Sequence, residues 1–316
     1  MTRFAPLLAA TSLFACAPMQ IETTAAQADV GNPGHVYELY FLGGQSNMEG
    51  FGYVAEIDPA LRSTPDNVVI YHGKSVEDGK DGGGAGLWAP LKPGHGLGFD
   101  TDGTTNMLSD RFGPELTFAH SMSAAAPTAR IAIVKFSRGG TGLIDGVSGF
   151  GSWDPDYTDA NGRNQYDNAL TAISEALRTR DVDGDGHADR LVPAGIVWMQ
   201  GEADAFDNQP AAVNYAANLA RLISLFRAAL GDDDLPVVIG RIKDSGDTEE
   251  TRVMTYSPVV RAQQKAFVEG DRCATLVTAS DNFGFLPDGW HYRSQDYVTL
   301  GREFAAAMRE LQTQCG

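Results

Sequence analysis

Several short apolar runs in this chain are continuous rather than alternating, and they constrain the fold more than any other feature. They cover residues 131–134, 195–198 and 237–239. A strand that is apolar at every position is buried on both faces, which is typical of a parallel sheet covered by helices. Helix-like segments separate the runs, so the chain alternates strand and helix as α/β folds do.

This alternation predicts five strands, at residues 36–42, 130–136, 194–199, 236–242 and 274–278. It predicts helices at 114–125, 164–179, 210–230, 258–269 and 294–312. The Gly- and Asp-rich segment 78–110 is predicted to be a long loop, and such loops often shape binding sites. The expected fold is a three-layer α/β/α sandwich with a central, mostly parallel, five-stranded sheet, formed by one domain over residues 34–316.

The net charge and the composition limit the classes of molecule that the protein is expected to bind. The formal net charge is −17 and the sequence pI about 4.6, whereas 43% of the residues are hydrophobic, enough for a sizeable core. An acidic surface repels phosphate backbones and anionic lipid, so we expect no nucleic-acid partner. It favours a neutral substrate without identifying one.

The N-terminus has the features of an export signal. Arg3 precedes an apolar stretch over residues 4–15, which is too short to span a bilayer, and Cys16 follows at a lipoprotein-type cleavage box. We expect a signal peptide over 1–16, a lipid on Cys16 as the only membrane contact, and a flexible tether over 17–33. The alternative is plain secretion with cleavage a few residues later. In both cases the protein is exported, to the bacterial cell envelope or beyond.

Two further cysteines, Cys273 and Cys315, complete the set of three. In an oxidising compartment they could pair and tie the last helix to a late strand. Two free buried thiols are the alternative. Neither cysteine has a partner histidine motif, so neither is expected to be catalytic.

Residues suited to acyl-transfer chemistry follow the predicted strands. In open α/β sheets the functional groups collect at the carboxyl ends of the strands. After the first strand, Ser46 sits on a glycine-containing turn that would expose its hydroxyl, although such turns also serve as ordinary helix caps. After the last, Asp288 precedes His291 by three residues, so one turn can supply a base and the carboxylate that orients it.

Two more turns could stabilise the oxyanion of a tetrahedral intermediate. Gly139 and Gly140 follow the second strand, and Gln200 follows the third, ahead of Glu202 and Asp204. A glycine N–H and a side-chain amide would complete a three-donor hole with the N–H of Ser46. The alternative is that both are merely tight strand-to-helix turns.

Together these four blocks resemble the SGNH (GDSL-type) hydrolase superfamily, in its sialate O-acetylesterase and plant-type acetylxylan esterase branch. The matching blocks are residues 44–48, 139–141, 200–204 and 288–291, with support from 113–115 and 300–301, so the resemblance covers roughly residues 36–310. It implies a flavodoxin-like sheet and no cofactor for catalysis.

The resemblance also assigns roles. It implies Ser46 as nucleophile, His291 as base and Asp288 as its orienting acid. Oxyanion donors would be Ser46, Gly140 (or Gly139 in its place) and Gln200, which stands where the superfamily usually has asparagine. Asn47, Glu202 and Asp204 are expected to brace the site.

An acidic loop suggests a cation. Asp181, Asp183, Asp185 and Asp189 occupy positions 1, 3, 5 and 9 of an EF-hand-like pattern, with His187 at position 7 and glycine at position 6. Position 12 is valine, so the usual bidentate glutamate is missing. We expect a structural calcium ion; the alternative is a solvated acidic turn.

The substrate expected from the resemblance is acetylated carbohydrate, either polysaccharide or a sialic-acid-type glycan. Trp88, Trp153 and Tyr157 could stack on sugar rings, although core packing is the more common fate of such residues. The rival function is a cell-surface carbohydrate-binding protein that kept the fold and lost catalysis.

Overall fold

The computed structural model describes Met1 and residues 34–158, 163–246 and 248–315. The expected signal peptide and tether lie outside the described residues, apart from Met1. Internal contacts divide the chain into Met1–Asn32 and Pro33–Gly316, and every element below belongs to the second unit. Within the described segments, no helix is both long and apolar enough to cross a membrane.

The central sheet has seven strands in the order β11-β10-β9-β1-β8-β3-β4. Their bounds are β1 Val36–Gly44, β3 Val68–His72, β4 Trp88–Pro90, β8 Arg130–Ser137, β9 Arg190–Met199, β10 Val237–Gly240 and β11 Ala274–Val277. All neighbouring pairs are parallel except β3 and β4, which pair antiparallel. The α/β class and the five predicted strands are therefore confirmed, but the count of five was too low.

Strands β3 and β4 escaped prediction for a physical reason. β3 is buried along its whole length, but the chain turns back from it into β4 without the crossover helix that marks a parallel strand. β4 lies inside the segment predicted to be a loop, as do the paired strands β5 (Asp100–Thr101) and β6 (Asn106–Met107). A further short pair joins β2 (Gly52–Tyr53) to β7 (Arg111–Phe112).

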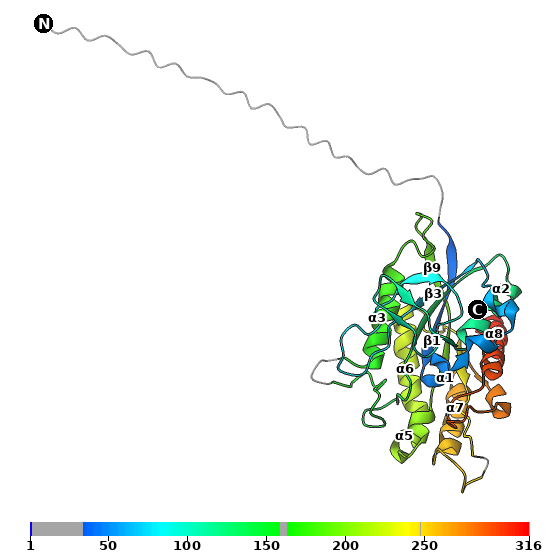
Figure 1. Ribbon diagram of the computed structural model, residues 1–316. Helices are drawn as coiled ribbons and strands as arrows, with labels where there is room; N and C mark the ends of the chain where they lie inside the picture. Colours follow the sequence, from blue (N-terminus) through cyan, green and yellow to red (C-terminus); the bar gives the residue numbers. More distant parts are fainter. Residues whose placement is uncertain (2–33, 159–162, 247, 316) are drawn as a thin grey trace. The chain divides into compact units, whose positions relative to one another are not determined.

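Helices cover both faces of the sheet (Figure 1). Their bounds are α1 Ser46–Glu49, α2 Glu115–Ala125, α3 Gln165–Arg178, α4 Glu202–Ala205, α5 Gln209–Val213, α6 Tyr215–Leu230, α7 Ser257–Gly270 and α8 Ser294–Cys315. Short 3-10 turns occur at η1 Val54–Glu56, η2 Pro59–Arg62 and η3 Ala279–Asn282. α2 packs against α8, whereas α3 packs on α6 and α6 on α7. The helix predicted over 210–230 divides into α5 and α6 because Asn214 has a non-helical backbone (φ −97°, ψ 4°).

Two features fix the last helix. Gly301 lets α8 approach α2 closely, because a Cβ there would lie 2.2 Å from the Pro114 carbonyl oxygen. Cys273 and Cys315 form a disulfide with their Cα atoms 5.7 Å apart, which joins the start of β11 to the end of α8. Of the two alternatives for these cysteines, the disulfide is the one the structure contains.

Candidate active site

The turn that carries Ser46 follows β1 and is held against the end of β9. Gly44 has φ 144°, and a Cβ on it would lie 2.0 Å from the Met199 carbonyl oxygen, so only glycine permits this approach. The N–H of Gln45 donates to the same carbonyl at 2.9 Å. Ser46 is then the first residue of α1, and its N–H has no intrahelical acceptor.

Ser46 and His291 line one cavity of about 540 Å³ at the carboxyl ends of the strands. The other lining residues are Gln45, Glu49, Phe51, Leu97, Arg138, Gly139, Gly140, Val147, Ser148, Phe150, Glu202, Ala203, Phe206 and Trp290. The structure thus brings together residues that are far apart in the sequence. The volume of this cavity lies within the range of ligand-binding cavities, about 300–1,000 Å³.

The Asp288–His291 pair has the geometry expected of a base and its orienting acid. His291 Nδ1 lies 2.9 Å from Asp288 Oδ2, while the other carboxylate oxygen accepts the N–H groups of Trp290 at 2.8 Å and His291 at 3.0 Å. Phe51 stacks on the imidazole, with ring centroids 3.4 Å apart and planes within 4°. The ring is therefore oriented from its edge and from its face.

Electrostatics lower the pKa values of both members of this pair. Burial lowers the pKa of His291 below its ordinary 6.5, although Asp288 pulls the pKa the other way. Burial raises the pKa of Asp288, but the hydrogen bonds from His291 and the two backbone N–H groups outweigh it, so the net pKa is below the ordinary value. At neutral pH the imidazole is neutral and can accept a proton.

Ser46 Oγ and His291 Nε2 make no hydrogen bond to each other in the described structure. Hydrogen bonds between a nucleophile and its base are often long without substrate and tighten when it binds. What links Ser46 to His291 in this structure is therefore that both residues line the same cavity.

The backbone N–H groups of Gly139 and Gly140 differ in whether they are free to bind a ligand. The N–H of Gly139 donates to Glu49 Oε2 at 3.0 Å. Gly140 lines the cavity, and its N–H has no acceptor within the residues that the structure describes. This arrangement favours Gly140 over Gly139 as a donor to a bound oxyanion.

Gln200 is not among the cavity-lining residues. Its side chain is fully buried, and Nε2 lies 2.9 Å from the Thr141 carbonyl oxygen and 2.6 Å from Asp204 Oδ2. Asp204 also accepts the Leu143 N–H, and burial raises its pKa to about 6. Asp204 thus links the turns of Leu143 and Gln200 by hydrogen bonds, whereas the Gln200 amide expected in the oxyanion hole already donates to other acceptors.

Asn47 connects three parts of the site. Its Nδ2 donates to Glu202 Oε1 at 2.8 Å and to the Trp290 carbonyl oxygen at 3.2 Å, and its Oδ1 accepts from Tyr297 at 2.8 Å. The residue after Ser46 is thus hydrogen-bonded to the residue before His291. Burial raises the pKa of Glu202, and its Oε2 is buried without a partner among the described residues.

Lys135 is a buried element that the sequence analysis missed. Lys135 lies in the C-terminal half of β8, and its Nζ donates to Glu115 Oε2 at 2.7 Å, to the His95 carbonyl oxygen at 2.7 Å and to the Glu49 carbonyl oxygen at 2.9 Å. Neither Lys135 nor Glu115 has more than 1% of its side chain exposed. The available signal was a lone lysine within an apolar strand sequence, a position that demands a buried anionic partner.

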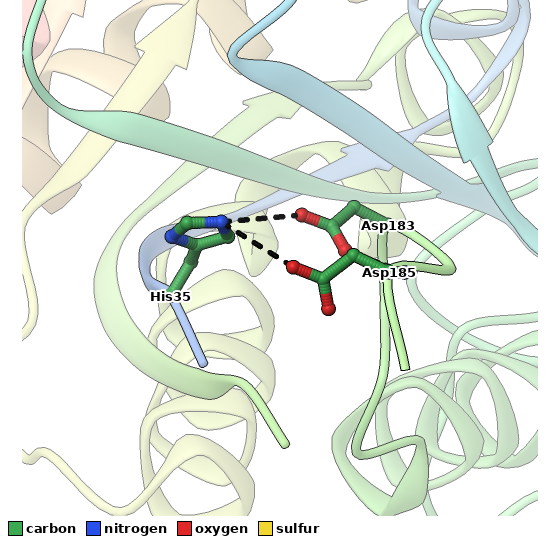
Figure 2. Close-up of side chains that lie close together, drawn as sticks. All are labelled: His35, Asp183 and Asp185. Atoms are coloured by element: carbon green, nitrogen blue, oxygen red, sulfur yellow. Dashed lines mark hydrogen bonds and ion pairs between the residues drawn. The ribbon is translucent and has the colours of Figure 1, made fainter. Parts of the chain in front are cut away.

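The acidic loop meets part of what calcium requires. Asp181, Asp183 and Asp189 offer oxygens within 4.8 Å of one another. Figure 2 shows that His35, the residue just before β1, faces Asp183 and Asp185. Several carboxylate oxygens also accept backbone N–H groups of the loop, among them both oxygens of Asp181. Calcium takes six to eight oxygen ligands, from carboxylates, backbone carbonyls and water. Calcium at this loop stays a prediction, as does any role for His187.

The aromatic residues proposed to meet sugar rings lie elsewhere. Trp153 is fully buried and packs on Trp198, and Trp88 is buried with its indole N–H on the Ala176 carbonyl oxygen. Tyr157 does not line the cavity. The rings that do line it are Phe51, Phe150, Phe206 and Trp290, which periodicity did not single out.

Comparison with protein families decides the affiliation. Residues 36–310 match the model of the family described as carbohydrate esterase, sialic acid-specific acetylesterase. The chain belongs to this family. It is therefore a carboxylic ester hydrolase of the carbohydrate esterase class, as the four sequence blocks predicted. No curated protein sequence matches the chain.

Solved structures share the fold of this carbohydrate esterase. A protein from Arabidopsis thaliana superposes with a TM-score of 0.61 at 20% identity, covering 86% of this chain and 98% of its own. A carbohydrate acetylesterase from Xanthomonas citri gives 0.57 at 19%, covering 87% and 56%, and NanS gives 0.55 at 14%, covering 88% and 98%. At these identities the likeness establishes the fold alone.

Proposed function

We propose that this protein is a serine O-acetylesterase that removes acetyl groups from carbohydrate through an acetyl-serine intermediate. One observation carries the proposal: His291, which is hydrogen-bonded to Asp288, lines the same cavity as Ser46, whose backbone N–H has no acceptor among the described residues. The imidazole is neutral, and the carboxylate fixes the proton on Nδ1, so Nε2 is left to serve as base.

The mechanism is a two-step acyl transfer. Ser46 Oγ attacks the ester carbonyl carbon as its proton passes to His291 Nε2. The tetrahedral intermediate collapses, and the sugar hydroxyl leaves with that proton. Water then attacks the acetyl-enzyme, with His291 again as base, and acetate departs. No step of this sequence requires a cofactor.

The substrate class rests on the family and on the cavity. The family name specifies sialic acid, but the net charge of −17 disfavours strongly anionic glycans. Arg138 is a cation on the cavity wall, and a local cation can overrule net charge. The proposal therefore extends to O-acetylated carbohydrate in general, neutral polysaccharide and sialic-acid-type glycans being the two cases to compare.

We also propose that the enzyme is exported, with Cys16 lipidated. The N-terminal sequence supports this, and so does the Cys273–Cys315 disulfide, because structural disulfides are rare in reducing compartments. Metabolic labelling with a radioactive fatty acid tests the lipid. The full-length protein should incorporate label and its Cys16→Ser variant should not; equal labelling of the two would contradict lipidation at Cys16.

The decisive test is hydrolysis of p-nitrophenyl acetate and release of acetate from acetylated glycans. The Ser46→Ala variant should retain its melting temperature and lose at least about a thousandfold in kcat/KM, as expected for loss of a triad nucleophile. A wild-type protein no faster than this variant would instead support the inactive carbohydrate-binding alternative. Glycan binding would then be measured by calorimetry.

A further inference from the structure

Gln45 carries the one side-chain amide among the described residues that line the cavity. It directly precedes the candidate nucleophile and is 3% exposed. Its Oε1 accepts from Gln200 Nε2 at 3.2 Å, from the N–H of Gly201 at 3.2 Å and from the N–H of Ala203 at 3.3 Å. Because all three partners are donors, the oxygen must occupy this position, and the orientation of the Gln45 amide is fixed.

The nitrogen of the same amide has no such partner. Across the described segments, Gln45 Nε2 has no hydrogen-bond acceptor, and it does not belong to the polar atoms buried without one. An amide whose oxygen faces the protein and whose residue lines a cavity presents its N–H groups to that cavity. Gln45 Nε2 is therefore a preorganised donor beside Ser46.

Two backbone donors share this surface. The N–H groups of Ser46 and Gly140 both lack an acceptor in the described chain, and both residues line the cavity. Oxyanion holes in acyl transfer use two or three such donors, aimed where negative charge develops. Gln200 is excluded by its contacts with Thr141 and Asp204, but it helps to hold Gln45.

We propose that Gln45 Nε2 is the side-chain donor of the oxyanion hole, in place of Gln200. The inference rests on the proposed esterase function. When Ser46 Oγ bonds to the carbonyl carbon, the π electrons move to the carbonyl oxygen, which accepts hydrogen bonds from Gln45 Nε2 and from the N–H groups of Ser46 and Gly140. Gln45 transfers no proton. His291 takes the Ser46 proton and returns it to the leaving alcohol.

Gln45→Glu tests the role, because it keeps an oxygen for the three N–H donors and replaces the free amide with a second oxygen. We expect kcat for p-nitrophenyl acetate to fall about 10²–10³-fold with KM nearly unchanged. Inhibition by methylboronic acid, whose serine adduct mimics the tetrahedral oxyanion, should weaken by a similar factor. If Gln45 had only a structural role, kcat and the affinity for methylboronic acid would not fall by similar factors.

Two controls separate this effect from damage to the fold. Gln312→Glu makes the same change at a side chain that contacts Tyr40 and the Ala194 carbonyl oxygen rather than the cavity, and it should leave activity unchanged. Gln45→Met keeps a side chain of similar length and adds no charge. If Gln45→Glu does not fold, as judged by thermal unfolding, kcat of Gln45→Met decides.

The outcomes distinguish this inference from the proposed function. If the wild type is no faster than Ser46→Ala, the esterase proposal fails and the oxyanion role fails with it. If the wild type is active but a folded Gln45 variant stays within about threefold of its kcat, only the role of Gln45 is overturned. A proportional loss of kcat and boronate affinity supports it.

Discussion

Replacing Lys135 by methionine should destabilise the protein strongly. Methionine fills the space of the lysine methylenes but removes the charge that faces Glu115, and the three acceptors of Nζ lose their donor. Breaking a buried ion pair by removing one partner costs about 3–5 kcal/mol, because the remaining charge is buried and unpaired. At about 2–4 °C per kcal/mol for domains of this order of size, the melting temperature should fall by roughly 10 °C.

Urea unfolding of a double-mutant cycle tests the reasoning. Glu115→Gln in the Lys135→Met background removes the orphaned charge, so it should restore at least about 2 kcal/mol of the free energy of unfolding. In wild-type protein the same Glu115→Gln change should destabilise. If Lys135→Met costs less than about 1 kcal/mol, or if the double variant is no more stable than the single, a buried charge is not what makes this lysine necessary.

Three further predictions concern pH and calcium. Because the pKa of His291 lies below its ordinary 6.5, kcat/KM of the esterase should fall with acidity through a midpoint below pH 6.5, and a midpoint at 7 or above would contradict the base assignment. The pKa of Asp204 is about 6 in the fold against an ordinary 3.8, so its contribution to stability is fully present below pH 3.8 and is lost as the pH rises through about 6. The advantage of wild type over Asp204→Asn in urea unfolding should shrink across that window, and a constant difference would refute the linkage. Calcium at about millimolar concentration should raise the melting temperature of wild type but not of Asp183→Asn, and equal shifts would exclude binding through the acidic loop.

The strands were predictable where burial on both faces leaves an unbroken apolar sequence and a helix follows. The run 131–134 in β8 and the run 195–198 in β9 satisfy both conditions, whereas β3 satisfies only the first. The strand β4 has three residues, and only its pairing with β3 identifies it. Its existence depends on tertiary contact, which no local pattern encodes.

The site was predictable to the level of the blocks but not of individual atoms. The turn chemistry of Asp288 and His291 is local, so three residues of spacing sufficed to predict their hydrogen bond. Whether a side-chain amide is free to donate into the cavity is not determined by the local sequence. Whether Gln45 or Gln200 faces the cavity depends on donors and acceptors from separate turns, which only the folded chain brings together.

The hydrogen bond from Asn47 to the Trp290 carbonyl spans 243 positions of the chain. During synthesis, the turn that carries Ser46 emerges long before the loop that carries His291. A chain that ends before that loop lacks His291, so under the proposed mechanism it would have no hydrolase activity. Recovery of turnover on refolding should accordingly trail the recovery of helical signal, since closure of so long a loop comes late. Ester hydrolysis thus reports on completion of the whole fold rather than on any part of it.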